Sequence, residues 1–228
     1  MLLHVPNVLD VQQVAHCRER LAASDWLDGR VTAGYQSAQT KNNLQLPDDH
    51  PVARELGSIV LDGLSRSPTF VAGALAKRIF PPLFNCYKPG HSFGIHVDNA
   101  VRYPRTGEDR SAMRTDLSAT LFLSEPDEYE GGELVVEDSF GTHSVKLPAG
   151  DLILYPAGSL HQIEPVRSGE RVASFFWIQS MVRDDAERRL LFDLDLAIQN
   201  LNLQVAKHPA MVQLVGIYHN LLRRWTEI

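Results

Sequence analysis

Residues 85–98 constrain the fold of this chain more than any other segment. They read as a strand, a Pro-Gly turn and a second strand that ends in His96-Val97-Asp98. Alternate side chains of a β-strand share a face, so we expect His96 and Asp98 to point the same way. That arrangement suits two ligands of one metal ion. His161, much further along the chain, offers a third ligand.

Two imidazoles and one carboxylate form the facial set of ligands that non-haem Fe(II) oxygenases use. Zinc is an alternative, because catalytic zinc sites also keep three protein ligands. A single His-x-Asp triplet arises by chance, and the chain has nine histidines. In the strand region, His91 precedes His96 by an odd spacing that predicts the opposite face, and His143 has no acidic neighbour at ligand spacing. We therefore expect neither to bind the metal.

Short apolar runs separated by turn residues predict a strand-rich core from about residue 79 to residue 180. About eight short strands at this spacing indicate a β-sandwich or barrel, whereas strands that alternate with helices would indicate a parallel sheet. The mouth of a small barrel is a common place for a ligand site. The expected strands lie near residues 80–88, 92–98, 116–124, 132–137, 142–147, 151–155, 160–165 and 171–179.

Helical patterns flank this core on both sides. Asp10 and Gln13 form a capping-box pattern before an apolar stripe, which predicts a helix over 10–23. Two more helices are expected after Pro47 and over 67–76. After residue 181 two apolar stripes predict a C-terminal helical hairpin, packed on the core or on another subunit. We expect three parts: an N-terminal helical flank (1–78), the core (79–180) and a C-terminal helical region (181–228).

Composition excludes several classes of function. The net charge of −6 argues against general nucleic-acid binding, which usually requires a basic surface. No apolar run approaches the roughly 18 residues that a membrane span needs, and the first ten residues do not resemble a signal peptide. The two cysteines, Cys17 and Cys86, follow no metal or redox spacing, so buried thiols in a reducing compartment are expected. These features favour a cytoplasmic protein.

Arg171 makes the iron interpretation more specific. It opens the apolar strand 171–179, and by period two it shares a face with Phe175 and Trp177. A cation on such a face is costly unless it meets an anion or extends to solvent from the strand end. The functional interpretation is a guanidinium that grips a carboxylate with two hydrogen bonds. A dicarboxylic keto acid would then chelate iron at one end and meet Arg171 at the other. Tyr87 either adds a hydroxyl to that carboxylate or is a core tyrosine.

The loop over 99–115 begins one residue after Asp98. A loop of this length in a compact domain is usually functional or mobile. We expect it to line the substrate entrance, the alternative being a solvated surface excursion. Its arginines point to an acidic or carboxylate-bearing partner. They are Arg102, Arg105, Arg110 and Arg114.

A run of residues through the core matches a known pattern in order and spacing. The matching positions are Cys86-Tyr87, Pro89-Gly90, Phe93, His96-Val97-Asp98, Gly131-Gly132-Glu133-Leu134, Gly150-Asp151, Tyr155-Pro156, His161 and Arg171. In this the chain resembles the Fe(II)- and 2-oxoglutarate-dependent dioxygenases of the prolyl 4-hydroxylase-like group, and it is most similar to the bacterial PKHD-type hydroxylases. The resemblance covers essentially the whole chain. It implies an α+β fold with a double-stranded β-helix (jelly-roll) core, N-terminal flanking helices and a C-terminal helical hairpin.

The resemblance also implies roles for individual residues. His96, Asp98 and His161 would bind Fe(II), Arg171 would hold the distal carboxylate of 2-oxoglutarate with help from Tyr87, and Trp177 would wall the pocket. The expected reaction is O2-dependent hydroxylation coupled to decarboxylation of 2-oxoglutarate to succinate and CO2, with L-ascorbate as auxiliary reductant. One departure is Phe122, which stands where certain animal prolyl hydroxylases have a second cofactor-binding tyrosine. The substrate is not identified; prolyl or lysyl side chains and a small molecule of iron uptake are the candidates.

Two other functions remain open at the level of sequence. A cupin-type metalloenzyme that does not use 2-oxoglutarate would need His96, Asp98 and His161 but not Arg171. An iron-responsive binding module acting through the C-terminal helices would bind iron without forming succinate. The same helices are also candidates for a homo-oligomer contact.

Overall fold

The computed structural model describes residues 1–32, 39–104, 111–138, 141–205 and 208–227. The helices expected from apolar stripes and capping residues are all present. A short 3-10 turn, η1, covers Gly29–Thr32. The α-helices are α1 (Val11–Ala22), α2 (Pro51–Arg66), α3 (Pro68–Ala74), α4 (Asp185–Val205) and α5 (Ala210–Trp225).

The helix starts follow from their capping residues. Asp10 accepts a hydrogen bond from the backbone N–H of Gln13, whose side chain accepts one from the backbone of Asp10, so the predicted capping box is confirmed. Ser67 caps α3 in the same way through the N–H of Phe70. Asp184 accepts from the N–H of Glu187 at the start of α4.

The strands include every run expected in the core, together with shorter strands that the pattern did not predict. β1 near the N-terminus and the two-residue strands β2, β3 and β4 belong to the unpredicted group. The strands are β1 (Leu3–Val5), β2 (Leu27–Asp28), β3 (Lys41–Asn42), β4 (Leu44–Gln45), β5 (Ala76–Ile79), β6 (Leu83–Tyr87), β7 (Ser92–His96), β8 (Val101–Arg102), β9 (Met113–Arg114), β10 (Leu117–Phe122), β11 (Tyr129–Gly131), β12 (Leu134–Asp138), β13 (Gly141–Val145), β14 (Leu152–Pro156), β15 (His161–Ile163), β16 (Val166–Gly169) and β17 (Arg171–Ser180).

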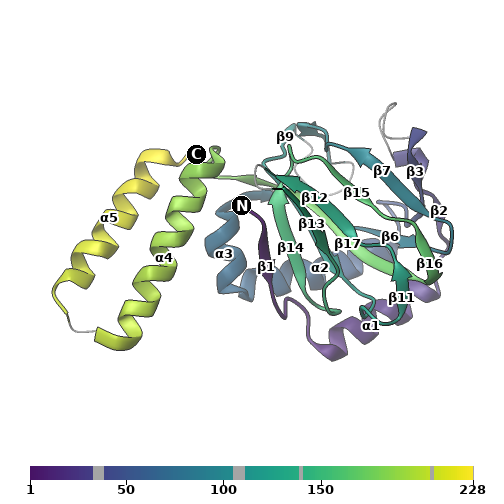
Figure 1. The fold of residues 1–228 in the computed structure, drawn as a ribbon, viewed down its shortest axis with the longest axis horizontal. Coiled ribbons are helices and arrows are strands. Elements are labelled where there is room, and N and C mark those ends of the chain that lie inside the picture. The colour runs from purple at the N-terminus through teal and green to yellow at the C-terminus, as the bar shows by residue number, and fades with distance from the viewer. Residues whose placement is uncertain (33–38, 105–110, 139–140, 206–207, 228) are drawn as a thin grey trace.

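Two antiparallel sheets form the centre of the molecule (Figure 1). The larger sheet has the order β1-β14-β10-β17-β6-β4-β2, with β5 also paired to β17. The smaller sheet has the order β13-β12-β15-β7-β3. Neighbours in both sheets are mostly distant in sequence, as expected for a jelly roll rather than a meander. Strands from residues 1–45 complete the edges of both sheets.

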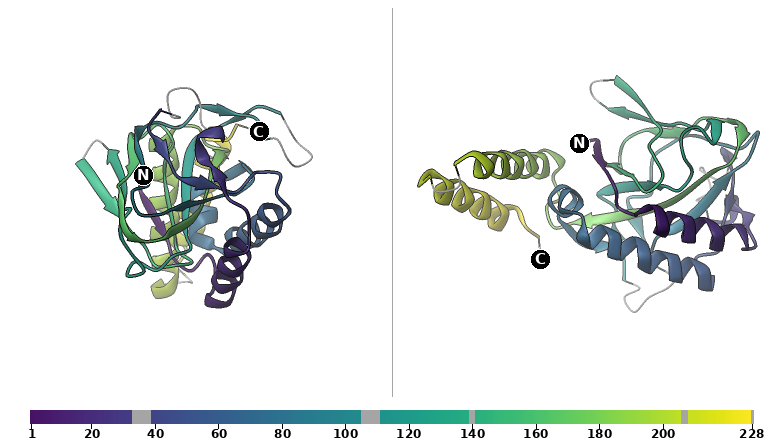
Figure 2. Two further views of the ribbon diagram at one scale, coloured as in Figure 1. Left: turned by 90° about the vertical axis from the view of Figure 1, so that its right-hand side faces the viewer. Right: turned by 90° about the horizontal axis from the view of Figure 1, so that it is seen from below.

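Side chains along the strands of the larger sheet alternate between its two faces, and each face packs into its own hydrophobic core. Leu117, Ala119 and Leu121 of β10 face α1 and α2, which lie along the outer side of this sheet (Figure 2). Phe122 of β10 and Tyr155 of β14 face inward, toward the smaller sheet. The same alternation therefore directs the remaining inward residues of β10 and β17 into the space between the sheets, where the candidate site lies.

The α4–α5 hairpin projects to one side of the sheets (Figure 1). At its base Leu191 of α4 packs with Leu75 and Val182 in a small core of its own. Arg188 is buried there and donates a hydrogen bond of 2.7 Å to the carbonyl of Val182. No helix within the described residues has the length and apolarity that a membrane crossing requires.

Candidate metal and co-substrate site

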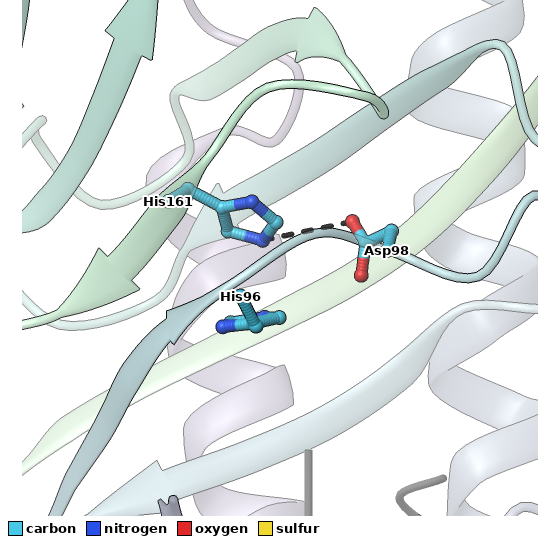
Figure 3. Close-up of side chains that lie close together, drawn as sticks. All are labelled: His96, Asp98 and His161. Carbon is cyan, nitrogen blue, oxygen red and sulfur yellow. Dashed lines mark ion pairs between the residues drawn. The ribbon is translucent and has the colours of Figure 1, made fainter. Parts of the chain in front are cut away.

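His96, Asp98 and His161 come together at one end of the space between the sheets (Figure 3). His96 ends β7, Asp98 follows two residues later, and His161 begins β15, where it pairs directly with His96. One ligand atom from each residue lies within 4.8 Å of the other two. His161 Nε2 is 3.6 Å from Asp98 Oδ2. The structure thus brings together the three residues that the sequence singled out, within ligand reach of one ion.

Both imidazole rings are oriented by backbone carbonyls. His96 Nδ1 lies 2.8 Å from the carbonyl oxygen of Gly94, and His161 Nδ1 lies 3.0 Å from that of Ser159. A carbonyl can only accept, so each Nδ1 carries the proton and each Nε2 keeps its lone pair. This is the tautomer and the outer contact that metal-binding histidines ordinarily show.

The carboxylate is held from the neighbouring sheet. Ser118, an inward residue of β10, donates a hydrogen bond of 2.6 Å from Oγ to Asp98 Oδ2. The backbone N–H of Asp98 donates to the carbonyl of Ala157 at 3.4 Å. Ser118 therefore links the larger sheet to the cluster and fixes the orientation of one of its three members.

His96 is kept neutral by its surroundings. Burial, followed by the neighbouring His161, lowers the pKa of His96 to about 4, against the opposing effects of the Gly94 carbonyl and Asp98. Its ring also stacks on Phe93, with centroids 3.7 Å apart. A histidine must be neutral to bind a metal ion, so this environment favours ligation at neutral pH.

The other two histidines of the strand region lie elsewhere. His91 Nδ1 accepts a hydrogen bond of 3.2 Å from the backbone N–H of Lys88. His143 Nε2 lies 3.1 Å from the carboxylate of Asp138. Neither belongs to the cluster of candidate metal ligands found among the described residues.

Arg171 is fully buried, with 1% of its surface exposed, so it does not extend to solvent. It begins β17 opposite Tyr87 of β6, and its guanidinium carbon lies 5.4 Å from the Tyr87 ring and 5.3 Å from the Phe122 ring. Within the described part of the chain, Nε and both Nη atoms have no hydrogen-bond partner. A buried guanidinium without acceptors is costly, so this position calls for an anion.

Two buried tyrosines, Tyr87 and Tyr155, lie close enough to Arg171 to sense its charge. Burial raises the pKa of Tyr87 to about 12, with the charge of Arg171 opposing. Burial, and then the charge of Asp98, raise the pKa of Tyr155 well above its usual value, again with Arg171 opposing. The Tyr155 ring is 5.2 Å from that of His161. Both hydroxyls therefore keep their protons and can donate hydrogen bonds. Tyr155 belongs to the run of residues that matches the family pattern, but no role was predicted for it.

An open cavity adjoins the three clustered residues and both tyrosines. The three clustered residues line it together with Tyr87, Tyr155 and Trp177, while Arg171 lies behind the Tyr87 wall. Trp177 forms one side, edge-on to Phe80 at 5.4 Å and to Phe175 at 5.7 Å.

Four polar residues of the cavity were not predicted from the sequence: Lys41 on β3, Asn85 on β6, and Ser118 and Thr120 on β10. Lys41 is 6% exposed and donates a hydrogen bond of 2.9 Å to Gln45 Oε1. Burial, followed by the charge of Arg102, lowers the pKa of Lys41 to about 8, with Asp98 and Asp28 opposing. No local signal marks Lys41, because its position depends on the pairing of β3 with β7.

The loop over 99–115 begins and ends in a small ladder of its own. β8 pairs with β9, with Val101 opposite Arg114. Arg102 lines the cavity, whereas Arg114 pairs with Asp116 at 2.7 Å. Arg105 and Arg110, the other arginines of interest, lie outside the described residues.

Comparison with known proteins first defines the class. The model of the 2OG-Fe(II) oxygenase superfamily matches residues 82–179. A prolyl-4-hydroxylase from Pseudomonas putida has a similar fold at 19% identity and a TM-score of 0.54, covering 78% of this chain and 92% of its own. A prolyl hydroxylase from Trichoplax adhaerens in complex with a hypoxia-inducible-factor peptide also has a similar fold, at 15% identity and a TM-score of 0.55. The match covers 83% of this chain and 86% of the other. The predicted α+β fold with a jelly-roll core is confirmed, and the protein is an oxygenase of the class that uses Fe(II), 2-oxoglutarate and O2.

Relatives that match over their full length then identify the family within this class. PKHD-type hydroxylases from Xanthomonas campestris pv. campestris and Pseudomonas putida are 60% and 54% identical over 228 residues, which is 100% of both chains in each comparison. The model of the PKHD-type hydroxylase C-terminal domain matches residues 185–227. This chain belongs to the PKHD-type hydroxylases.

Proposed function

We propose that His96, Asp98 and His161 bind one Fe(II) ion, and that Arg171 and Tyr87 hold the distal carboxylate of 2-oxoglutarate. Trp177 is proposed to wall the side of the pocket that the substrate enters. The observation that carries this proposal is Arg171, a buried guanidinium without hydrogen-bond partners in the described structure. Its charge acts on Tyr155, whose ring lies beside His161 of the three clustered candidate ligands.

The donor set fits a non-haem iron. Two neutral imidazoles and one carboxylate leave the remaining positions of the ion for other ligands. When bound, iron and 2-oxoglutarate supply the oxidising power: one oxygen atom of O2 enters a C–H bond as hydroxyl and the other enters succinate, with loss of CO2. The protein's own residues bind, orient and exclude water. Ser118 and the Gly94 and Ser159 carbonyls keep the ligands aligned, and Tyr87 offers a protonated hydroxyl.

The burial of Arg171 favours this function over a cupin-type enzyme that does not use 2-oxoglutarate. Such an enzyme has no need of an anion behind Tyr87. It would leave three guanidinium nitrogens without acceptors in the folded protein. A dicarboxylate co-substrate removes that cost by supplying the acceptor oxygens.

The remaining proposals concern the setting of the reaction. We propose L-ascorbate as auxiliary reductant, a cytoplasmic location and a homo-oligomer contact through the C-terminal helices. We also retain the division into 1–78, 79–180 and 181–228. Prolyl or lysyl side chains and a small molecule of iron uptake remain the candidate substrates, near the loop over 99–115.

The test measures succinate formed from 2-oxoglutarate by the purified protein with Fe(II) and O2, with and without L-ascorbate. Succinate is expected at a low rate without substrate, rising when ascorbate is added. The His161→Ala variant should bind Fe(II) weakly and form none. An iron-responsive binding module would instead bind Fe(II) in the wild type and yield no succinate, even with candidate substrates present.

A further inference from the structure

Tyr155 of β14 is a buried residue of the cavity to which the proposed function gives no role. It is 4% exposed and lines the cavity. In the pairing of β14 with β10 it lies directly opposite Ser118, and residues directly opposite in an antiparallel pair point to the same face of the sheet. Its ring lies edge-on to the ring of His161, with centroids 5.2 Å apart. Tyr155 therefore brings a phenol group inward, to the end of the cavity where the candidate metal ligands lie.

The Tyr155 ring also packs with the side chains that contact Arg171. It belongs to one hydrophobic cluster with Tyr87 and Phe122, the two rings that lie 5.4 Å and 5.3 Å from the Arg171 guanidinium carbon. After burial, the charge of Asp98 raises the pKa of Tyr155, while the charge of Arg171 lowers it. The phenol is thus within electrostatic range of both the proposed iron site and the proposed anion-binding arginine. Tyr155 is therefore placed to contact a molecule that both of them hold.

The hydroxyl of Tyr155 is close to that of Thr120. Thr120 follows Ser118 by two residues on β10, so it points inward too. It is 6% exposed and lines the cavity. Burial raises the pKa of Tyr155, and a hydrogen bond with Thr120 partly opposes that effect. A hydrogen bond that favours the deprotonated phenol is one that the phenol oxygen accepts. Thr120 is therefore the donor.

This direction of the hydrogen bond leaves the proton of Tyr155 available. A phenol has one donor proton and can accept as well. Because Thr120 donates its own proton, the Tyr155 proton requires another acceptor, and a buried donor without one is costly. At neutral pH 2-oxoglutarate offers only acceptors, in two carboxylates and a keto oxygen. Its chemistry therefore matches the group that Tyr155 brings to the cavity.

We propose that the hydroxyl of Tyr155 donates a hydrogen bond to 2-oxoglutarate, and that Thr120 orients this hydroxyl. The inference rests on the proposed function and deepens it, because the co-substrate is then held from three strands: by Arg171 on β17, Tyr87 on β6 and Tyr155 on β14. Tyr155 is a co-substrate-binding residue and Thr120 a positioning residue. Neither is assigned to the metal, so Fe(II) binding should not depend on either hydroxyl.

The experiment is calorimetric titration of 2-oxoglutarate into the Fe(II)-loaded protein without O2. Tyr155→Phe removes the hydroxyl and keeps the ring. Tyr218→Phe is the matched control, because Tyr218 lies on α5 and packs against the small core at the base of the C-terminal hairpin. We expect Tyr155→Phe to weaken 2-oxoglutarate binding by about tenfold to a hundredfold, as for loss of a hydrogen bond to a charged group. Tyr218→Phe should leave the affinity unchanged.

A double-variant cycle tests the role of Thr120. Thr120→Val removes the hydroxyl, whereas Thr120→Ser keeps one. In the wild-type background Thr120→Val should weaken 2-oxoglutarate binding by about threefold to tenfold, as for loss of a neutral hydrogen bond, and Thr120→Ser should keep most of the affinity. In the Tyr155→Phe background Thr120→Val should have no further effect, because the hydroxyl that it orients is already absent. Additive losses would contradict the positioning role.

Fe(II) affinity and the melting temperature of the metal-free protein report on structural damage. Both should be nearly the same in the wild type and in Tyr155→Phe. Unchanged 2-oxoglutarate affinity in Tyr155→Phe overturns the inference, as does a loss of Fe(II) affinity that accounts for the whole effect. Either result leaves the proposed function intact, because the wild type still binds 2-oxoglutarate. If the wild type itself fails to bind 2-oxoglutarate, the proposed function fails and this inference fails with it.

Discussion

Arg171 and Arg188 are both 1% exposed, yet they differ in what surrounds them. Arg188 donates hydrogen bonds to the Val182 carbonyl and to Asp185, whereas the nitrogens of Arg171 have no partner in the described structure. Replacing Arg171 with Ala should therefore weaken 2-oxoglutarate binding by about tenfold to a hundredfold, as for loss of a charge-assisted bond. Fe(II) binding should remain within about twofold. Titration of 2-oxoglutarate into the Fe(II)-loaded variant without O2 measures this.

Arg188→Ala is the control, since its loss should lower the melting temperature and leave 2-oxoglutarate affinity unchanged. Unaltered affinity in Arg171→Ala would instead support the cupin-type alternative.

Ser118 acts on the metal site through Asp98. Its hydroxyl donates the 2.6 Å hydrogen bond that orients the carboxylate. Ser118→Ala should lower Fe(II) affinity by about 10-fold to 100-fold, the usual effect of removing an outer contact of a metal ligand. Competition against a coloured chelator measures the change. Ser65→Ala removes an exposed hydroxyl that bonds within α2, and it should have no effect on Fe(II) affinity.

For single residues, the sequence predicted the site where the residues that act together are close in the chain. The period of two relates His96 to Asp98 and places Arg171, Phe175 and Trp177 on one inward face of β17, and these patterns need no knowledge of the fold. Lys41 and Ser118 enter the cavity through pairing with residues far away in the chain. Their roles depend on register, which the sequence of either strand alone does not determine.

Two glycines in helices allow the effect of packing on stability to be measured separately from the effect of helix propensity. In α2, a Cβ on Gly63 would meet the backbone oxygen of Val8, while a Cβ on Gly216 in α5 would meet nothing within 4 Å. Ala exceeds Gly in helix propensity by about 1 kcal/mol. Gly216→Ala should therefore raise stability by up to about that amount, and Gly63→Ala should lower it. Urea unfolding of both variants measures the difference, and equal stabilisation would mean that α2 can move away from Val8.

The predicted elements were those with strong repeating patterns. α1 and α4 start at capping residues and carry apolar stripes, and the long core strands alternate regularly. β1 was missed because it has three residues and its partner, β14, lies about 150 residues further on. β2, β3 and β4 have two residues each and form only because the edges of both sheets offer free backbone groups.

The C-terminal hairpin projects from the sheets and exposes apolar side chains (Figure 1). Leu203 on α4 is 86% exposed and Val212 on α5 is 78% exposed. Exposed apolar side chains on a projecting hairpin favour association with a second copy of the chain. We predict a concentration-dependent dimer that Leu203→Glu and Val212→Glu together convert to monomer, as seen by sedimentation equilibrium.

Asn202→Glu adds the same charge at a neighbouring exposed position of α4 and should leave the dimer intact. A wild-type protein that stays monomeric at all accessible concentrations contradicts this prediction.

β17 crosses the larger sheet as one strand of ten residues. Its first residue meets the co-substrate under our proposal, and its seventh, Trp177, walls the pocket under the same proposal. During evolution, substitutions near Trp177 can therefore alter which compounds are accepted while the chemistry that drives every turnover is preserved. Families built on this framework are expected to diversify at one end of the strand and to stay uniform at the other.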